Sequence, residues 1–98
     1  MLAEARTRIR RYTPEEARAD DELLLVDIRA ADERERFGTI ADAQHIPLSV
    51  LPWRTEQLAG RRVCLVCAQG YSSSLAAALL VELGVDAGDL IGGYEAWS

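Results

Sequence analysis

The sequence predicts one α/β domain, residues 1–98, built on a mostly parallel sheet, and two observations support this. Segments typical of strands and of helices alternate along the chain, as they do in α/β folds. Two strand-like segments, residues 23–28 (LLLVDI) and 61–67 (RRVCLVC), are dominated by apolar side chains. Such runs are typical of strands buried on both faces, as in a parallel sheet.

In the first half of the chain, residues 9–12 are expected to form a short strand. A helix should follow, because Thr13 suits the N-cap, Pro14 suits the first turn, and two glutamates come next, near the positive end of the helix dipole. After the apolar strand at 23–28, residues 30–37 suit a short charged helix that a glycine ends.

In the second half, residues 45–47 are expected to form a short strand, and a turn or brief helix should lie between Pro47 and Pro52. The strand at 61–67 leads to the clearest helix, residues 72–83. Serines lie at the expected start of this helix, and leucines at 75, 79 and 83 recur on one face. Residues 89–91 suit a third strand, and Gly93 should open a final helix.

Composition and charge exclude several classes of protein. The chain is 49% hydrophobic and 28% charged, with a net charge of −5. This acidic balance argues against binding to nucleic acid or to an anionic membrane, since either needs a basic face. The arginines at 6, 8, 10 and 11 are a local exception and are expected to form a solvated edge.

Location is predicted from what the sequence lacks. No apolar run approaches the ~18 residues of a membrane span, and the N-terminus shows no apolar region typical of an export signal. Two cysteines are too few for a secreted disulfide framework. We therefore expect a cytoplasmic protein with no membrane partner, in which thiols stay reduced.

Cys67 is the expected nucleophile. It ends a strand, and the segment after it has no bulky charged side chain and contains a glycine. The backbone N–H groups of such a loop can turn inward, and the following helix start adds unpaired N–H groups. These donors favour a thiolate and any anion that the sulfur acquires. The residues expected to bind substrate here are Ala68, Gln69, Gly70, Tyr71, Ser72 and Ser73.

Cys64 and Cys67 also match C-x-x-C, the spacing of thiol–disulfide exchangers and zinc sites. Here a strand holds the motif, and residues three apart in a strand point to opposite faces, which makes a disulfide geometrically awkward. Zinc would need more ligands than one His and two Cys supply. We expect Cys64 to lie in the core, where free cysteine usually packs, and we expect no metal site.

Three motifs occur in an order that resembles one known family. An Asp-x-Arg follows a buried strand at 27–29, a C-x-x-G-x-[RS]-S segment precedes a helix at 67–73, and a GG-x-x-[AG]-W ending lies at 92–97. Together they span nearly the whole chain. On these motifs the chain resembles the single-domain rhodaneses, members of the sulfurtransferase family. The resemblance implies a five-stranded parallel sheet flanked by helices on both faces.

The resemblance also implies a reaction. The Cys67 thiolate would take the outer sulfur of a small donor such as thiosulfate, and the resulting persulfide would pass that sulfur to cyanide or to an acceptor thiol, including a protein thiol. No metal or organic cofactor is implied. Asp27 would brace the active loop through hydrogen bonds, and Arg29 would pair with Glu33. The alternative for both is a structural ion pair, which we favour for Arg29.

Several details stay open at this point. Ser72 and Ser73 also suit helix caps, and Tyr71 either faces the substrate or lies on the surface. The family's G-H-I-P-G-A segment is changed here at residues 38–43, and His45, outside that position, is expected to be structural. Residues 68–73 include no Arg or Lys, so thiosulfate is expected to be a weak donor.

Three other functions compete with sulfur transfer. Cysteine phosphatases and arsenate reductases need an Arg six residues after the Cys to fork the phosphate, and this chain has Ser73 there. A non-catalytic module could bind a partner protein through Trp53 and Tyr71, although inactive relatives typically lose the cysteine that this chain keeps. A thiol that senses oxidants would form sulfenic acid without transferring sulfur.

Overall fold

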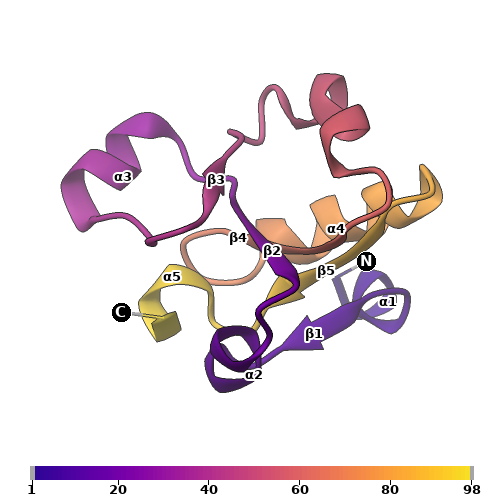
Figure 1. Cartoon of the computed structure of the whole chain (residues 1–98), viewed down its shortest axis with the longest axis horizontal. Helices are drawn as coiled ribbons and strands as arrows, with labels where there is room; N and C mark the ends of the chain where they lie inside the picture. The colour runs from indigo at the N-terminus through magenta and orange to yellow at the C-terminus, as the bar shows by residue number, and fades with distance from the viewer. Residues whose placement is uncertain (1, 98) are drawn as a thin grey trace.

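The computed structural model describes residues 2–97 and contains a five-stranded sheet in which every pairing is parallel (Figure 1). The strand order is β1-β5-β4-β2-β3. Helices cover both faces of this sheet, so the predicted fold class is confirmed. The strands are β1 (Arg10–Tyr12), β2 (Leu23–Asp27), β3 (Gln44–His45), β4 (Arg62–Val66) and β5 (Asp86–Leu90).

The helices alternate with these strands along the chain. They are α1 (Leu2–Thr7), α2 (Pro14–Ala19), α3 (Ala31–Phe37), the 3-10 helix η1 (Leu51–Leu58), α4 (Ser72–Glu82) and α5 (Gly93–Trp97). Helix α2 begins as predicted. The Oγ1 of Thr13 accepts from the backbone N–H of Glu16 at 3.1 Å, and the Glu16 carboxylate accepts from the N–H of Thr13 at 2.9 Å.

The core lies on both faces of the sheet, as the apolar runs predicted. All five residues of β2 are buried, and so are the last four of β4. On one face, side chains of β2 and β4 pack with η1 and α4 in a cluster that includes Cys67. On the other face, a cluster that includes Cys64 packs with Ala17 of α2 and with Tyr94 and Trp97 of α5. The two cysteines therefore lie on opposite sides of the sheet.

Helix α4 forms as predicted, but its leucine repeat does not mark its buried face. Leu75, Leu79 and Leu83 are between 42% and 56% exposed. The buried positions are instead mostly small residues: Ser73, Ser74, Ala76, Ala77 and Leu80. Small side chains let the helix lie close to β4 and β5, so the leucines are left on the outer side of the helix.

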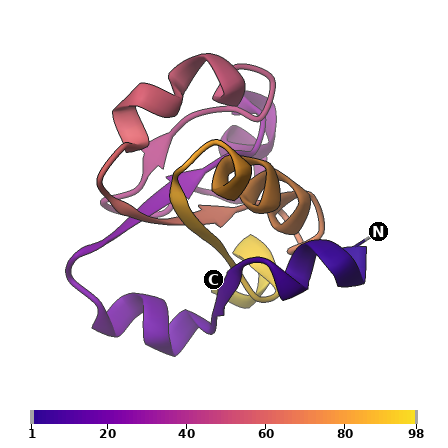
Figure 2. The same cartoon turned by 90° about the vertical axis from the view of Figure 1, so that its right-hand side faces the viewer.

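Helix α1 was absent from the sequence prediction, and it packs beside α4, as Figure 2 shows. The turn or brief helix expected between Pro47 and Pro52 is instead the 3-10 helix η1, which begins at Leu51 and continues to Leu58. The strand expected at 45–47 is shorter and earlier, at Gln44–His45. Position 71, rather than a serine, is the N-cap of α4, and Tyr71 makes no side-chain capping bond there. The capping role considered for Ser72 and Ser73 is therefore wrong.

Candidate active site

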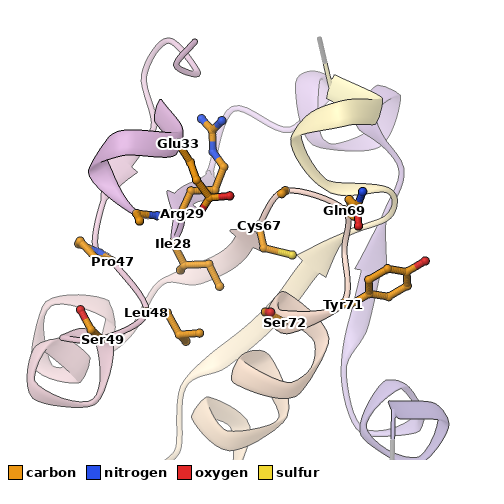
Figure 3. A pocket seen from close by; sticks show the side chains of 12 residues that line it. Ile28, Arg29, Glu33, Pro47, Leu48, Ser49, Cys67, Gln69, Tyr71 and Ser72 are labelled. Carbon is orange, nitrogen blue, oxygen red and sulfur yellow. Dashed lines mark hydrogen bonds between the residues drawn. The ribbon is translucent and has the colours of Figure 1, made fainter. Parts of the chain in front are cut away.

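A cavity of about 330 Å³ opens at the carboxyl edge of the sheet, and the side chain of Cys67 points into it (Figure 3). Parallel sheets commonly bind ligands at this edge, where strands lead into helices. Only 7% of Cys67 is exposed, so a reagent must enter the cavity to reach the sulfur. The lining residues are Ile28, Arg29, Ala30, Glu33, Pro47, Leu48, Ser49, Cys67, Ala68, Gln69, Tyr71 and Ser72.

Two backbone amides of the loop point at the sulfur, as the sequence predicted. The N–H of Gly70 lies 3.1 Å from Sγ of Cys67, and the N–H of Ser73 lies 3.4 Å from it. Gly70 has a φ of +89°, and a Cβ on it would come within 3.0 Å of the Gly92 nitrogen. The loop therefore needs glycine at this position to place its N–H on the sulfur.

The Gly-Gly ending of the chain holds the loop from the other side. The N–H of Tyr94 donates to the carbonyl of Cys67 at 2.8 Å, and the N–H of Glu95 donates to that of Ala68 at 3.2 Å. A Cβ on Gly93 would come within 2.4 Å of the Cys67 carbonyl oxygen. This close approach explains why a loop motif and a motif 25 residues later, counted from Cys67 to Gly92, belong to one site.

The remaining loop residues differ in how they meet the cavity. Ala68, Gln69, Tyr71 and Ser72 line it, but the ring of Tyr71 points away from Cys67 (Figure 3) and the residue is 58% exposed. The side chain of Gln69 donates to the carboxylate of Glu95 at 2.8 Å, which is a further link between the loop and α5.

Ser73 is buried and joins the sulfur to a buried carboxylate. Its Oγ accepts from the Cys67 thiol at 3.3 Å and donates to Oδ2 of Asp89 at 2.8 Å. Asp89 lies in β5 and is fully buried. Its carboxylate also accepts from Ser74 Oγ at 2.6 Å and from Arg11 Nε at 2.9 Å.

Arg6 and Arg11 contact the loop on the side away from the cavity. The expectation of a solvated edge is therefore wrong for these two arginines. Nη2 of Arg6 donates to the carbonyl of Gly70 at 2.9 Å, and Nη2 of Arg11 lies 3.4 Å from the same oxygen. Sequence reasoning missed both contacts and missed Asp89. One signal was available. Asp89 lies in a predicted strand, and an acidic side chain that is buried in a sheet needs a cationic partner.

Asp27 and Arg29 form a buried ion pair beside the cavity. The guanidinium donates to the Asp27 carboxylate at 3.0 and 2.8 Å and to the Gly38 carbonyl at 2.8 Å, and it lies over the Tyr94 ring. The hydrogen bonds to Asp27 raise the pKa of Arg29 above its already high ordinary value. Both side chains are about 1% exposed.

This pair corrects two expectations. Arg29 pairs with Asp27 rather than with Glu33, whose carboxylate instead accepts from the N–H of Ala30 at 3.1 Å. Asp27 accepts its side-chain hydrogen bonds from Arg29 rather than from the active loop. Arg29 therefore forms part of the cavity wall, and Asp27 holds it in place. His45 lies beside them, with Nε2 2.7 Å from the Arg29 carbonyl, in the structural position expected of it.

Cys64 lies in the core, as predicted. Its side chain is fully buried in the apolar cluster on the opposite face of the sheet, and both thiols are free. Burial raises the pKa of the Cys64 thiol, and the charge of Asp89 adds to that effect. Cys64 is therefore held as a neutral thiol.

Two features of residues 2–97 bear on other functions. Within that range, no group of three His, Cys, Asp or Glu side chains is placed to hold a metal ion. Across the same residues, no helix has the length and apolar character that crossing a bilayer requires.

Comparisons with known proteins agree on one family. The profile of the rhodanese-like domain matches residues 13–98. Over 84 residues the chain is 33% identical to a Bacillus subtilis (strain 168) protein named "Putative sulfurtransferase YtwF", covering 85% of this chain and 81% of that protein.

Two solved structures share the fold closely. A rhodanese-like domain protein from Staphylococcus aureus is 26% identical, with a TM-score of 0.84 and coverage of 92% of each chain. A Rhodopseudomonas palustris CGA009 protein, described as of unknown function and a possible tyrosine phosphatase, is 25% identical, with a TM-score of 0.87, covering 98% of this chain and 84% of that one.

Proposed function

This chain belongs to the rhodanese-like family, and from that premise we propose that it is a sulfurtransferase that carries sulfane sulfur as a persulfide on Cys67. The observation that carries the proposal is the pair of loop amides, Gly70 and Ser73, directed at Sγ from 3.1 and 3.4 Å. Donors in that position stabilise a thiolate before the reaction and a persulfide anion after it.

The proposed cycle has two displacements. The Cys67 thiolate attacks the outer sulfur of a donor such as thiosulfate, the donor's S–S bond breaks, and sulfite leaves with the bonding electron pair. The terminal sulfur of Cys67–S–S⁻ is then attacked by an acceptor thiolate or by cyanide. The new bond forms on that sulfur, the Cys67 thiolate leaves, and the product is a persulfide or thiocyanate.

The cavity favours donors that need no cationic clamp. Arg29 is the only Lys or Arg among the lining residues, and its guanidinium is buried against Asp27 and Gly38. Glu33 adds an acidic group to the same wall. A dianion such as thiosulfate would meet amides and a helix start only, so we expect it to load Cys67 slowly and polysulfide or mercaptopyruvate to load it faster.

Phosphatase chemistry is the weaker reading of the same loop, even though one structural relative is described as a possible tyrosine phosphatase. A C-x5-R loop needs a guanidinium where this chain has Ser73, and that hydroxyl is hydrogen-bonded to Asp89. The nearby Arg6 and Arg11 donate to a carbonyl on the inner side of the loop.

The proposal is tested by the intact mass of the protein after incubation with thiosulfate, polysulfide and mercaptopyruvate in turn. The native chain and Cys64→Ala should gain one sulfur atom that cyanide removes, and Cys67→Ser should gain none. If no donor loads Cys67 in the folded protein, the proposal is wrong, and a partner-binding module becomes the better account. If Cys67 forms only sulfenic acid with peroxide, the oxidant-sensing account is favoured.

A further inference from the structure

We infer that three charged residues beneath the active loop, Arg6, Arg11 and Asp89, are positioning residues that set the reactivity of Cys67. We call them the basal cluster. They come from α1, β1 and β5, and none of them lines the cavity. The inference deepens the proposed function because it takes Cys67 as the working thiol, but it concerns the thiol alone and can be tested without any sulfur donor.

The basal cluster contacts the loop and fixes its orientation. Gly70 donates its N–H to the sulfur and presents its carbonyl to the two arginines, 2.9 Å from Arg6 and 3.4 Å from Arg11. Arg6 also donates through Nε to Ser74 Oγ at 3.1 Å. Gly70 lies between β4 and α4, in neither element, and has a φ of +89°. Its carbonyl is held on the inner side of the loop by the two arginines and by Ser74 Oγ at 3.2 Å.

The basal cluster also determines the charge beneath the loop. Asp89 is fully buried and is separated from the sulfur by one hydroxyl, that of Ser73. A carboxylate so close disfavours a neighbouring thiolate unless its charge is neutralised. Arg11 donates to both carboxylate oxygens, at 2.9 and 3.3 Å, and its side chain is 21% exposed. Arg6 brings a second positive charge, so the basal cluster carries a net positive charge under the loop.

The other charged groups around the site do not duplicate this effect. Arg29 is paired with Asp27, which Arg34 also approaches at 3.3 Å. Glu33 lines the cavity and Glu95 is bonded to Gln69, and both carry negative charge. Tyr71 points away from the sulfur. The positive charge that can favour a Cys67 thiolate therefore comes from beneath the loop, where the sequence of the loop itself provides none.

A merely structural role and an electrostatic role predict different directions for the change in Cys67 reactivity when Arg11 or Asp89 is replaced. If the basal cluster only holds the loop, removing Arg11 or removing Asp89 should disturb Cys67 in the same direction. If its charge matters, Arg11→Gln leaves the Asp89 carboxylate without its fork and lowers the thiolate fraction. Asp89→Asn removes the negative charge, leaves both guanidiniums, and raises the thiolate fraction.

The experiment measures the rate of Cys67 alkylation by iodoacetamide between pH 5 and 9 on the full chain, with peptide mass spectrometry to separate Cys67 from Cys64. At neutral pH we expect Arg11→Gln to react about tenfold more slowly, Arg6→Gln about threefold more slowly, and Asp89→Asn about threefold faster. The pH of half-maximal rate should move up for Arg11→Gln and down for Asp89→Asn.

The matched control is Arg8→Gln. Arg8 lies just after the helix that holds Arg6 but pairs with the exposed residues Glu4 and Glu82, so its removal should leave the pH profile unchanged. Arg11→Lys keeps the charge without the fork and should recover most of the native rate, which separates charge from folding if Arg11→Gln is unstable. Shifts of the same sign in Arg11→Gln and Asp89→Asn, or shifts no larger than in Arg8→Gln, would overturn the inference. Neither outcome depends on whether Cys67 carries sulfur.

Discussion

The two cysteines of this chain are three residues apart, yet they lie in opposite environments. Cys64 is in the middle of β4, packed among apolar side chains on one side of the sheet. Cys67 follows the end of the same strand on the other side, with two backbone N–H groups and one hydroxyl around its sulfur. Burial keeps the first thiol neutral, whereas two backbone amides are directed at the second sulfur.

The comparison shows that burial alone does not decide which groups surround a cysteine sulfur. Both cysteines are buried, one in β4 and the other directly after it. What differs is the end of the strand: past Val66 the backbone no longer forms a ladder with neighbouring strands, and its amides are free to turn toward the sulfur. The active loop therefore presents backbone N–H groups to the sulfur, and its conformation is fixed by glycines and by contacts from residues far away in sequence.

The largest expected effect comes from removing one of those amides from Cys67. Gly70→Ala places a side chain on a residue with φ +89° and pushes its Cβ toward the Gly92 nitrogen, 3.0 Å away. The loop must shift and its N–H must leave the sulfur. We expect sulfur loading of Cys67 to slow by about a hundredfold, since lost amide donors cost rate on this scale. The loading rate is measured by mass spectrometry of the persulfide in samples quenched at a series of times.

Gly84→Ala is the control for Gly70→Ala. Gly84 has the same φ of +89°, but a Cβ there meets nothing within 4 Å, and the residue follows α4 far from the loop. It should lower the free energy of unfolding by about 1 kcal/mol and leave the loading rate unchanged. Equal loading rates in the two variants would mean that the Gly70 amide has no role.

The next effect concerns Cys64 and alkaline pH. Its pKa is raised in the folded protein, so folding is favoured fully below the thiol's unfolded pKa of about 8.5 and progressively less above it. We expect the free energy of unfolding to fall by up to about 1.4 kcal/mol for each pH unit above 9 from this group. Urea titrations of the native chain and Cys64→Ala, each at pH 7.5 and 10, measure the difference. Parallel pH slopes in the two proteins would contradict the account of Cys64.

The smallest effect is expected at Gln69, a cavity-lining residue that is also exposed to solvent. Gln69 is exposed and bonds to the exposed residue Glu95, while the backbone of α5 holds the loop independently through Cys67 and Ala68. Gln69→Ala should change sulfur loading by less than about threefold, because a single exposed hydrogen bond contributes about 1 kcal/mol or less. A loss as large as that of Gly70→Ala would show that the side chain contacts the donor directly.

The sequence predicted what local pattern controls and missed what distant contacts control. The apolar runs identified β2 and β4, and Thr13 with Pro14 located the start of α2, because these signals depend on neighbours in the chain. The amides around Cys67 were predicted from a strand end, a glycine and a helix start.

The basal cluster could not be predicted in this way. Arg6 and Gly70 are 64 residues apart, and Arg11 and Asp89 are 78 apart. Only the parallel pairing of β1 with β5, and the packing of α1 on α4, brings them together. The leucine repeat of α4 predicted the wrong buried face for a related reason. The buried face of that helix depends on how closely the helix approaches the sheet, which is a distant contact.

The most direct test of the central claim lets both thiols compete in the native chain. Arg62 is the last basic residue, so trypsin leaves Cys64 and Cys67 in one peptide, residues 63–98, and fragmentation of that peptide locates any added sulfur. After loading with polysulfide, the account predicts the sulfur on Cys67 alone, with Cys64 unmodified until the protein is unfolded. Sulfur found on Cys64 in the folded protein, or shared equally between the two, would contradict it.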